Sequence, residues 1–326
     1  MKKLFILAFT LMATISSTAQ LITIQTDAAE GALPIVTAHT ASPIVYDAEN
    51  DHTVVRLAAT AVAKDIESIT GMRPAVSTTL TAGSTPIIAG TIGQSSHIDA
   101  LIANGKLDAS AITDKWETYT LQVVDTPYDG IGRALLIAGS TPRGTAYGLF
   151  ELSRLMGVSP WVWWADVVPE PRHTLYATAG TLTAHEPSVK YRGLFINDED
   201  WGMKPWAAKK MDTDIQDIGP RTYERVFELM LRLRANLIWP AMHECTKAFW
   251  YYTANATLAK EYDIVLGSSH CEPMLRNNVF EWFNEGGNWN NYNFATNAAG
   301  VTDYWRKRVV TIRHFRPLLS PLFWKY

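Results

Sequence analysis

The stretch Gly193-Leu194-Phe195-Ile196-Asn197-Asp198-Glu199-Asp200-Trp201 passes from apolar residues directly into amide, carboxylate and indole side chains. Two later stretches have the same plan: 236–244 changes from Asn-Leu-Ile-Trp to Pro-Ala-Met-His-Glu, and 263–272 from Asp-Ile-Val-Leu-Gly to Ser-Ser-His-Cys-Glu. Short apolar runs bounded by polar or turn residues are typical of buried strands. The sequence therefore predicts three strands whose carboxyl ends carry polar side chains.

A helical pattern separates the first strand from the second, because Val226, Leu229, Met230 and Leu233 share one face of a helix. Parallel strands need such a crossover. In βα folds the loops at the carboxyl ends of the strands meet on one face, where ligands bind. We expect the three polar clusters to form one site, and their acids, imidazoles and indoles suit the processing of sugars.

Composition limits the class of partner. The chain has 326 residues, enough for about two domains, and a net charge of -3. It has no basic stripe, so binding to nucleic acid is not expected. Its 12 tryptophans either stack on sugar rings or fill the core.

The amino terminus has the features of a signal peptide over residues 1–19. Met1-Lys2-Lys3 precedes an apolar run from Leu4 to Ile15, and small residues follow up to Ala19. The run is too short to span a bilayer. We expect a secreted or periplasmic protein with no membrane contact after the signal is removed.

Residues 20–183 are expected to form a mixed α/β domain. Helical spacing of apolar residues between Val54 and Ile69 ends at Gly71, and β-rich runs follow at 85–91, 119–124 and 134–138. The segment 139–144 contains glycines but lacks the spacing of a phosphate-binding loop, so a turn from strand to helix is expected. Residues 184–190 are expected to link this domain to the three-strand unit.

The chain has two cysteines, Cys245 and Cys271, each just after a predicted strand. A disulfide and two free thiols both remain open. Zinc binding by His243, Glu244, His270 and Cys271 is disfavoured, because no pair has the usual ligand spacing. We expect neither a metal nor a cofactor.

Four motifs resemble the xylan α-1,2-glucuronidases of glycoside hydrolase family 115. They are Tyr-Arg-Gly-Leu-Phe-Ile-Asn-Asp-Glu-Asp at 191–200, Ala-Asn-Leu-Ile-Trp-Pro-Ala-Met at 235–242, the run 261–274, and Gly-Ser-Thr-Pro-Arg-Gly-Thr-Ala-Tyr-Gly at 139–148. The resemblance implies an α/β domain followed by a (β/α)8 barrel. It also implies inverting removal of glucuronic or 4-O-methyl-glucuronic acid side chains from glucuronoxylan, by two carboxyl groups about 6.5 to 9.5 Å apart.

The sequence departs from this family pattern in its last part. A barrel takes roughly 200 residues or more, so residues 191–311 are expected to form only its first part, and 312–326 look like an aberrant tail. The catalytic carboxyls that the resemblance implies are expected beyond Tyr326, as is the arginine for the uronate carboxylate. A truncated and inactive form is therefore expected. Cys271 also stands where similar sequences tend to have a histidine.

The resemblance assigns sugar binding to Asp198 and His270. The alternative role for Asp198 is that of a helix N-cap, and the alternative for His270 is a purely structural role. Strand-end placement adds four substrate-binding candidates, although such residues also satisfy loop backbone: Asn197, Glu199, Trp239 and Glu272.

Two other functions remain open. A hexosaminidase-like glycosidase would use adjacent acids such as Asp198 and Glu199, although the strings at 239–242 and 272–274 fit the glucuronidases better. A non-catalytic carbohydrate-binding protein is the alternative from another class. The sequence does not predict the oligomeric state.

Overall fold

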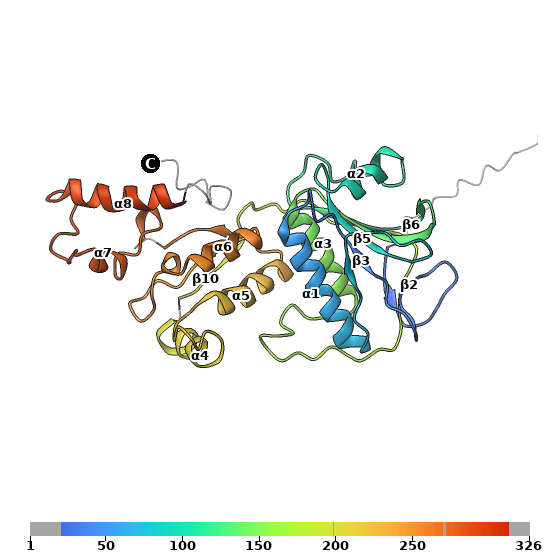
Figure 1. The fold of residues 1–326 in the computed structure, drawn as a ribbon, viewed down its shortest axis with the longest axis horizontal. Coiled ribbons are helices and arrows are strands. Elements are labelled where there is room, and N and C mark those ends of the chain that lie inside the picture. The colour runs from blue at the N-terminus through green and yellow to red at the C-terminus, as the bar shows by residue number, and fades with distance from the viewer. Residues whose placement is uncertain (1–20, 198, 270–271, 313–326) are drawn as a thin grey trace, which may run out of the picture.

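The computed structural model describes residues 21–197, 199–269 and 272–312, and these form two units that lie side by side along the long axis of the molecule (Figure 1). The predictions for Asp198, His270 and Cys271, for the signal peptide and for most of the tail concern residues outside these ranges. The domain boundaries given above stay predictions. Within the described part, no helix is both long enough and apolar enough to cross a membrane.

The amino-terminal unit is built on a six-stranded mixed sheet. Its strands lie in the order β4 (Val76–Ser77), β3 (Ile44–Val45), β5 (Ile87–Thr91), β7 (Ile131–Gly139), β6 (Tyr119–Tyr128) and β9 (Thr181–Thr183). The first four are parallel, and β6 and β9 are antiparallel to their neighbours. The strands predicted at 85–91, 119–124 and 134–138 are confirmed as β5, β6 and β7.

Helices cover both faces of this sheet, which explains why its central strands are almost wholly apolar. Ile87 and Leu135 contribute to the core under α1 (Thr53–Thr70) and α3 (Pro142–Leu155), whereas Ile88 and Leu136 pack with α2 (Ser96–Ala103). A smaller sheet of β1 (Ile24–Gln25), β8 (Leu175–Ala177) and β2 (Leu33–Val36) completes the unit.

The ends of two helices follow the predicted turn chemistry. α1 stops at Gly71, which has φ 75° and donates to the Glu67 carbonyl. α3 begins after Thr141, whose hydroxyl accepts from the Gly144 amide at 3.1 Å. At Gly139 a Cβ would lie 2.1 Å from the Thr145 nitrogen, so glycine allows the strand to approach the helix closely.

The second unit contains the three predicted strands, which are β10 (Gly193–Phe195), β11 (Leu237–Trp239) and β12 (Val265–Leu266). They form a parallel sheet in that order. The crossover helices are α5 (Pro220–Arg232), as predicted, and α6 (Thr253–Glu261). Figure 1 shows α7 (Glu281–Asn284) and α8 (Ala298–Ile312) farthest from the first unit, and α4 (Lys204–Lys210) beside β10.

The α/β fold class is confirmed, and the alternation of strand and helix in the second unit is the arrangement with which a barrel begins. The incomplete (β/α)8 barrel stays a prediction, and the described residues supply three parallel strands of it. Among them β10 pairs only with β11, and the side chains of Leu194 and Phe195 are 36% and 40% exposed.

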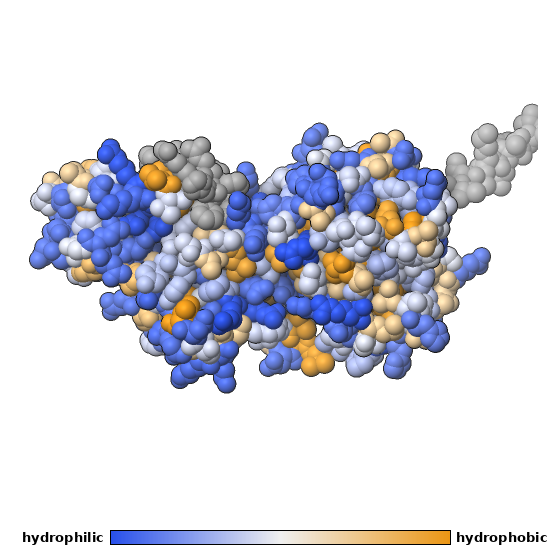
Figure 2. Space-filling view, viewed as in Figure 1, coloured by the Kyte–Doolittle hydropathy of each residue, from blue (hydrophilic) through white to orange (hydrophobic). Residues whose placement is uncertain are grey.

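One apolar core runs through both units. Leu149 and Phe150 of α3 belong to the same cluster as Val226 and Phe227 of α5. On the molecular face shown in Figure 2, apolar residues lie in small groups among hydrophilic ones. The two units are therefore packed together as one body by buried side chains.

Candidate functional site

The loops after β10, β11 and β12 lie next to one another, as their parallel order requires. Phe195 pairs in register with Trp239, and Ile238 with Leu266. Side chains of the first loop bond to the second, and a side chain that follows β12 bonds to the second as well. The predicted convergence of the three strand ends is confirmed for the described residues.

Glu199 is the most buried acid of this region, with no exposed surface. It lies at the start of a π-helical turn, Glu199–Met203. Its Oε1 accepts from the amides of Met242 at 2.7 Å and His243 at 3.3 Å. Its Oε2 is buried with no hydrogen-bond partner among the described residues. Glu199 thus joins the loop after β10 to the loop after β11.

Asp200 and His243 make a second link between the same two loops. The Asp200 carboxylate is bonded to Nδ1 of His243 and also to the Cys245 thiol. The bond from His243 lowers the pKa of Asp200, and the same bond raises the pKa of His243 above its usual value. Burial, followed by the bond to Asp200, raises the pKa of Cys245 to about 12. A thiol with such a pKa stays protonated at neutral pH and is a weak nucleophile.

Trp239 provides an aromatic surface at the end of β11. Its side chain is 38% exposed and meets the Phe195 ring edge to face, with ring centres 5.5 Å apart. At Gly267 a Cβ would lie 2.5 Å from Nε1 of Trp239, so the indole occupies the space that glycine leaves. A partly exposed indole beside carboxylates can stack on the apolar face of a sugar while polar neighbours bond its hydroxyls.

Glu272 lies after β12 and is 8% exposed. Its Oε1 accepts from the Asn277 side chain at 3.1 Å, and burial raises its pKa to about 7. Asn277 also donates to the Met242 carbonyl at 2.7 Å. The Met242 peptide is therefore held from both sides, by Glu199 at its amide and by Asn277 at its carbonyl.

The predicted substrate-binding residues differ in their exposure and in their bonds to protein groups. Asn197 and Trp239 are exposed at adjacent strand ends, whereas Glu199 and Glu272 are buried and bonded to protein groups. Asp198 and His270 lie outside the described residues. Three further residues of the site, Asp200, His243 and Asn277, were not among the predicted substrate-binding residues. The first two stand in the strand-end clusters, but nothing in the sequence marks Asn277.

A cavity of about 880 Å³ lies beside β10. Its walls include Leu194, Phe195 and Asn197 and a group of tryptophans from the 160–169 segment and α4. Trp163, Trp164 and Trp206 contact one another in this group, with ring centres 5.0 to 5.9 Å apart. Trp163, Trp164 and Trp206 are partly buried, whereas Trp201 and Trp239 are exposed.

No metal centre is apparent in the part of the chain that the structure describes, where no three His, Cys, Asp or Glu side chains are grouped to hold an ion. The disfavoured zinc set includes His270 and Cys271, which fall outside that part. A Cys245–Cys271 disulfide would also include a residue outside that part. The zinc site and the disulfide are therefore addressed by the sequence alone.

The chain is similar to proteins of one glycosidase family. Residues 184–320 match the model of glycosyl hydrolase family 115, and the match extends past Thr311 into the predicted tail. A solved family GH115 4-O-methyl-α-glucuronidase, described as specific for decorated arabinogalactans, is 42% identical with a TM-score of 0.70. The comparison covers 82% of this chain and 34% of that one, so the chain spans about a third of its length.

Other solved glycosidases are more distant. A GH20 exo-β-N-acetylglucosaminidase from Vibrio harveyi is 12% identical with a TM-score of 0.39, covering 74% of this chain and 34% of that one. A Streptomyces plicatus β-hexosaminidase is 12% identical with a TM-score of 0.43, covering 77% and 44%. No curated protein sequence matches the chain. Residues 184–320 therefore belong to glycosyl hydrolase family 115, and the described chain is related to a glucuronidase of that family.

Proposed function

We propose that this chain belongs to an exported glycoside hydrolase that removes glucuronic or 4-O-methyl-glucuronic acid side chains from a plant polysaccharide. The observation that carries the proposal is the exposed Trp239 indole beside the acid-rich strand-end loops, in a chain 42% identical to a solved glucuronidase. Export is supported by the pattern of residues 1–19.

The substrate is proposed as a polysaccharide with uronic acid branches. Glucuronoxylan follows from the family resemblance, and the solved relative is described as specific for decorated arabinogalactans. Trp239 would stack on a sugar ring, while Asn197, Asp198 and His270 would bond its hydroxyls.

The proposed chemistry is inversion at the anomeric carbon. One carboxylic acid protonates the leaving oxygen and one carboxylate activates water on the opposite face. Glu199 and Glu272 are not proposed for these two roles, because each is buried and bonded to protein groups of the neighbouring loop.

The proposal is tested by incubating the purified chain with glucuronoxylan, with decorated arabinogalactan and with the same polymers stripped of uronic acid. Release of free uronic acid with the decorated polymers alone would support it. Binding without release would favour the non-catalytic alternative. Release of N-acetylglucosamine from an aryl glycoside, with no response to uronic acid, would replace the proposal with the hexosaminidase alternative.

A further inference from the structure

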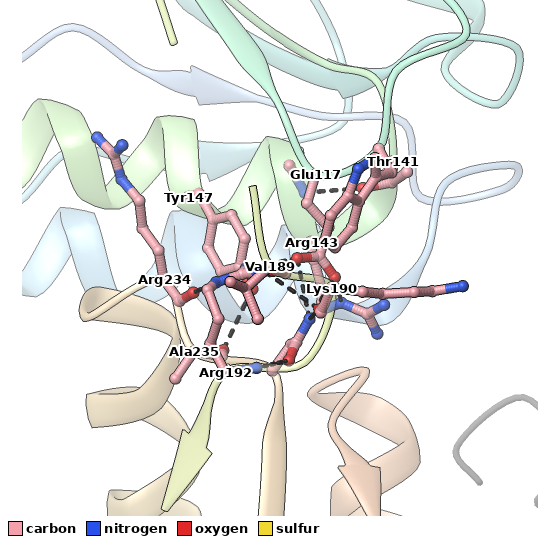
Figure 3. Close-up of polar contacts among 12 residues, drawn as sticks. Glu117, Thr141, Arg143, Tyr147, Val189, Lys190, Arg192, Arg234 and Ala235 are labelled. Carbon is pink, nitrogen blue, oxygen red and sulfur yellow. Dashed lines mark hydrogen bonds and ion pairs between the residues drawn. The ribbon is translucent and has the colours of Figure 1, made fainter. Parts of the chain in front are cut away.

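The three parallel strands begin at the boundary with the amino-terminal unit, on the side opposite the candidate site. Figure 3 shows Glu117 and Arg143 of that unit facing Arg192, which precedes β10. Five residues meet here, and we call them the strand-start network: Glu117, Arg143, Arg192, Asn236 and Asp263.

The first strand is held through Arg192. Its Nη2 donates to Oε2 of Glu117 at 2.5 Å. The Arg192 carbonyl accepts from the amides of Asn236 at 2.8 Å and Leu237 at 3.0 Å, which are the first backbone bonds between β10 and β11. A fixed Arg192 therefore fixes where the pairing of these two strands begins.

The second strand is held through Asn236, which is 1% exposed. Its Nδ2 donates to both carboxylate oxygens of Glu117, at 2.8 and 3.0 Å, and its Oδ1 accepts from the Arg192 amide at 2.9 Å. The Asn236 carbonyl accepts from the amide of Val265, the first residue of β12, at 2.7 Å. One side chain thus connects Glu117 to the starts of neighbouring strands.

The third strand is held through Arg143. Its Nε donates to Oε1 of Glu117 at 2.7 Å, and its Nη1 lies 2.6 Å from the Asp263 carbonyl and 3.1 Å from Asp263 Oδ1. Two carboxylates and two guanidinium groups therefore balance in charge. Glu117, at 4% exposure, requires such partners to remain buried as an ion.

External anchoring matters because the strands themselves are short. β10, β11 and β12 contain three, three and two residues, so few backbone bonds define their alignment. A slip of one residue would turn Phe195 and Trp239 to the opposite face of the sheet. We infer that Glu117 and Arg143 set the register of all three strands, so that the amino-terminal unit positions the strand-end loops. The consequence for sugar binding rests on the proposed function, whereas the register does not.

The test is amide hydrogen exchange on the full chain carrying Glu117→Gln. This change keeps the size of the side chain, removes its charge and replaces one acceptor facing Asn236 or an arginine with a donor. The amides of Leu237, Val265 and Gly267 should exchange at least about tenfold faster than in the wild type, relative to those of β5 and β7. Unchanged relative exchange at these three amides would overturn the inference.

The matched control is Asp65→Asn. Asp65 is also a buried carboxylate between the units, bonded to Arg232 at 2.8 and 2.9 Å and to Ser153 at 2.6 Å. It joins α1 to α5 rather than to a strand. Loss of the Asp65 charge should therefore accelerate exchange generally, and not more at Leu237, Val265 and Gly267 than elsewhere. The same pattern in both variants would mean that Glu117 contributes only general stability, which also overturns the inference.

Arg143→Lys is the milder second variant, for use if Glu117→Gln does not fold. Lysine keeps the charge but lacks the planar fork that reaches Glu117 and Asp263 together. Exchange should then accelerate more at Val265 and Gly267 than at Leu237, and a uniform change would contradict the inference. Exchange is measured without sugar, so failure of the wild-type chain to bind decorated polymers would refute the proposed function alone.

Discussion

Glu199 accepts a hydrogen bond of 2.7 Å from the Met242 amide, and this contact crosses from the loop after β10 to the loop after β11. Met242 is in turn bonded through its carbonyl to Asn277. The strand-end loops are therefore held together by protein groups, and the exposed Trp239 ring stands on a fixed support.

Replacing Glu199 with alanine should lower the free energy of unfolding by about 2 to 4 kcal/mol, because two amides lose their acceptor at a buried site. Glu199→Gln keeps an amide oxygen in reach of Met242 and His243 and should cost less. Urea unfolding of both variants measures the difference. Equal losses would show that the charge of Glu199, rather than its acceptor, stabilises the loops.

The buried Glu272 should make stability depend on pH. Its pKa is raised from 4.5 to about 7, so the folded state keeps a proton that the unfolded state releases between these values. Stability is therefore lost as pH rises from about 4.5 to 7, by roughly 3 kcal/mol in total. Above that range the loss remains, because both states are ionised.

Glu272→Gln removes this titration. The unfolding free energy of the variant minus that of the wild type should increase from pH 4.5 to pH 8, as measured by urea unfolding at each pH. Other titrating groups are common to both proteins and cancel. A difference that stays constant across the range would contradict the raised pKa.

His243 should titrate above its usual range because Asp200 stabilises its charged form. A raised histidine pKa stabilises the folded state at low pH, and this contribution disappears as pH rises through the folded value. In Asp200→Asn the pKa of His243 should fall, as followed by the NMR shift of its ring proton. Asp214→Asn, at an exposed pair with Arg221, is the control and should leave the titration in place.

Trp239→Ala should weaken binding of uronic-acid-decorated oligosaccharides by about 2- to 10-fold, the size expected for loss of one stacking contact. Trp201, which is 90% exposed, supplies the control through Trp201→Ala. Isothermal titration with fragments of glucuronoxylan or arabinogalactan measures both. A larger loss for Trp201→Ala would move the proposed sugar surface away from β11.

The elements with a regular apolar pattern could be predicted from the sequence, as β5, β6, β7, α1 and α5 show. α6 was not predicted, because small or polar side chains form its buried face: Asn255, Ala256 and Ala259. The convergence of the strand ends followed from the rule that parallel strands share one direction. The links from Asp200 to His243 and from Asn277 to Met242 depend on folded geometry that no local pattern encodes.

Among the described residues, one side of β10 has no neighbouring strand, and this affects how the chain behaves in solution. An edge strand that exposes Leu194 and Phe195 offers backbone groups and apolar surface to a second copy. Self-association should therefore grow with concentration, and dilute samples are the appropriate ones for spectroscopy. The substitution Leu194→Lys should reduce this self-association, because it places a charge on the exposed edge strand.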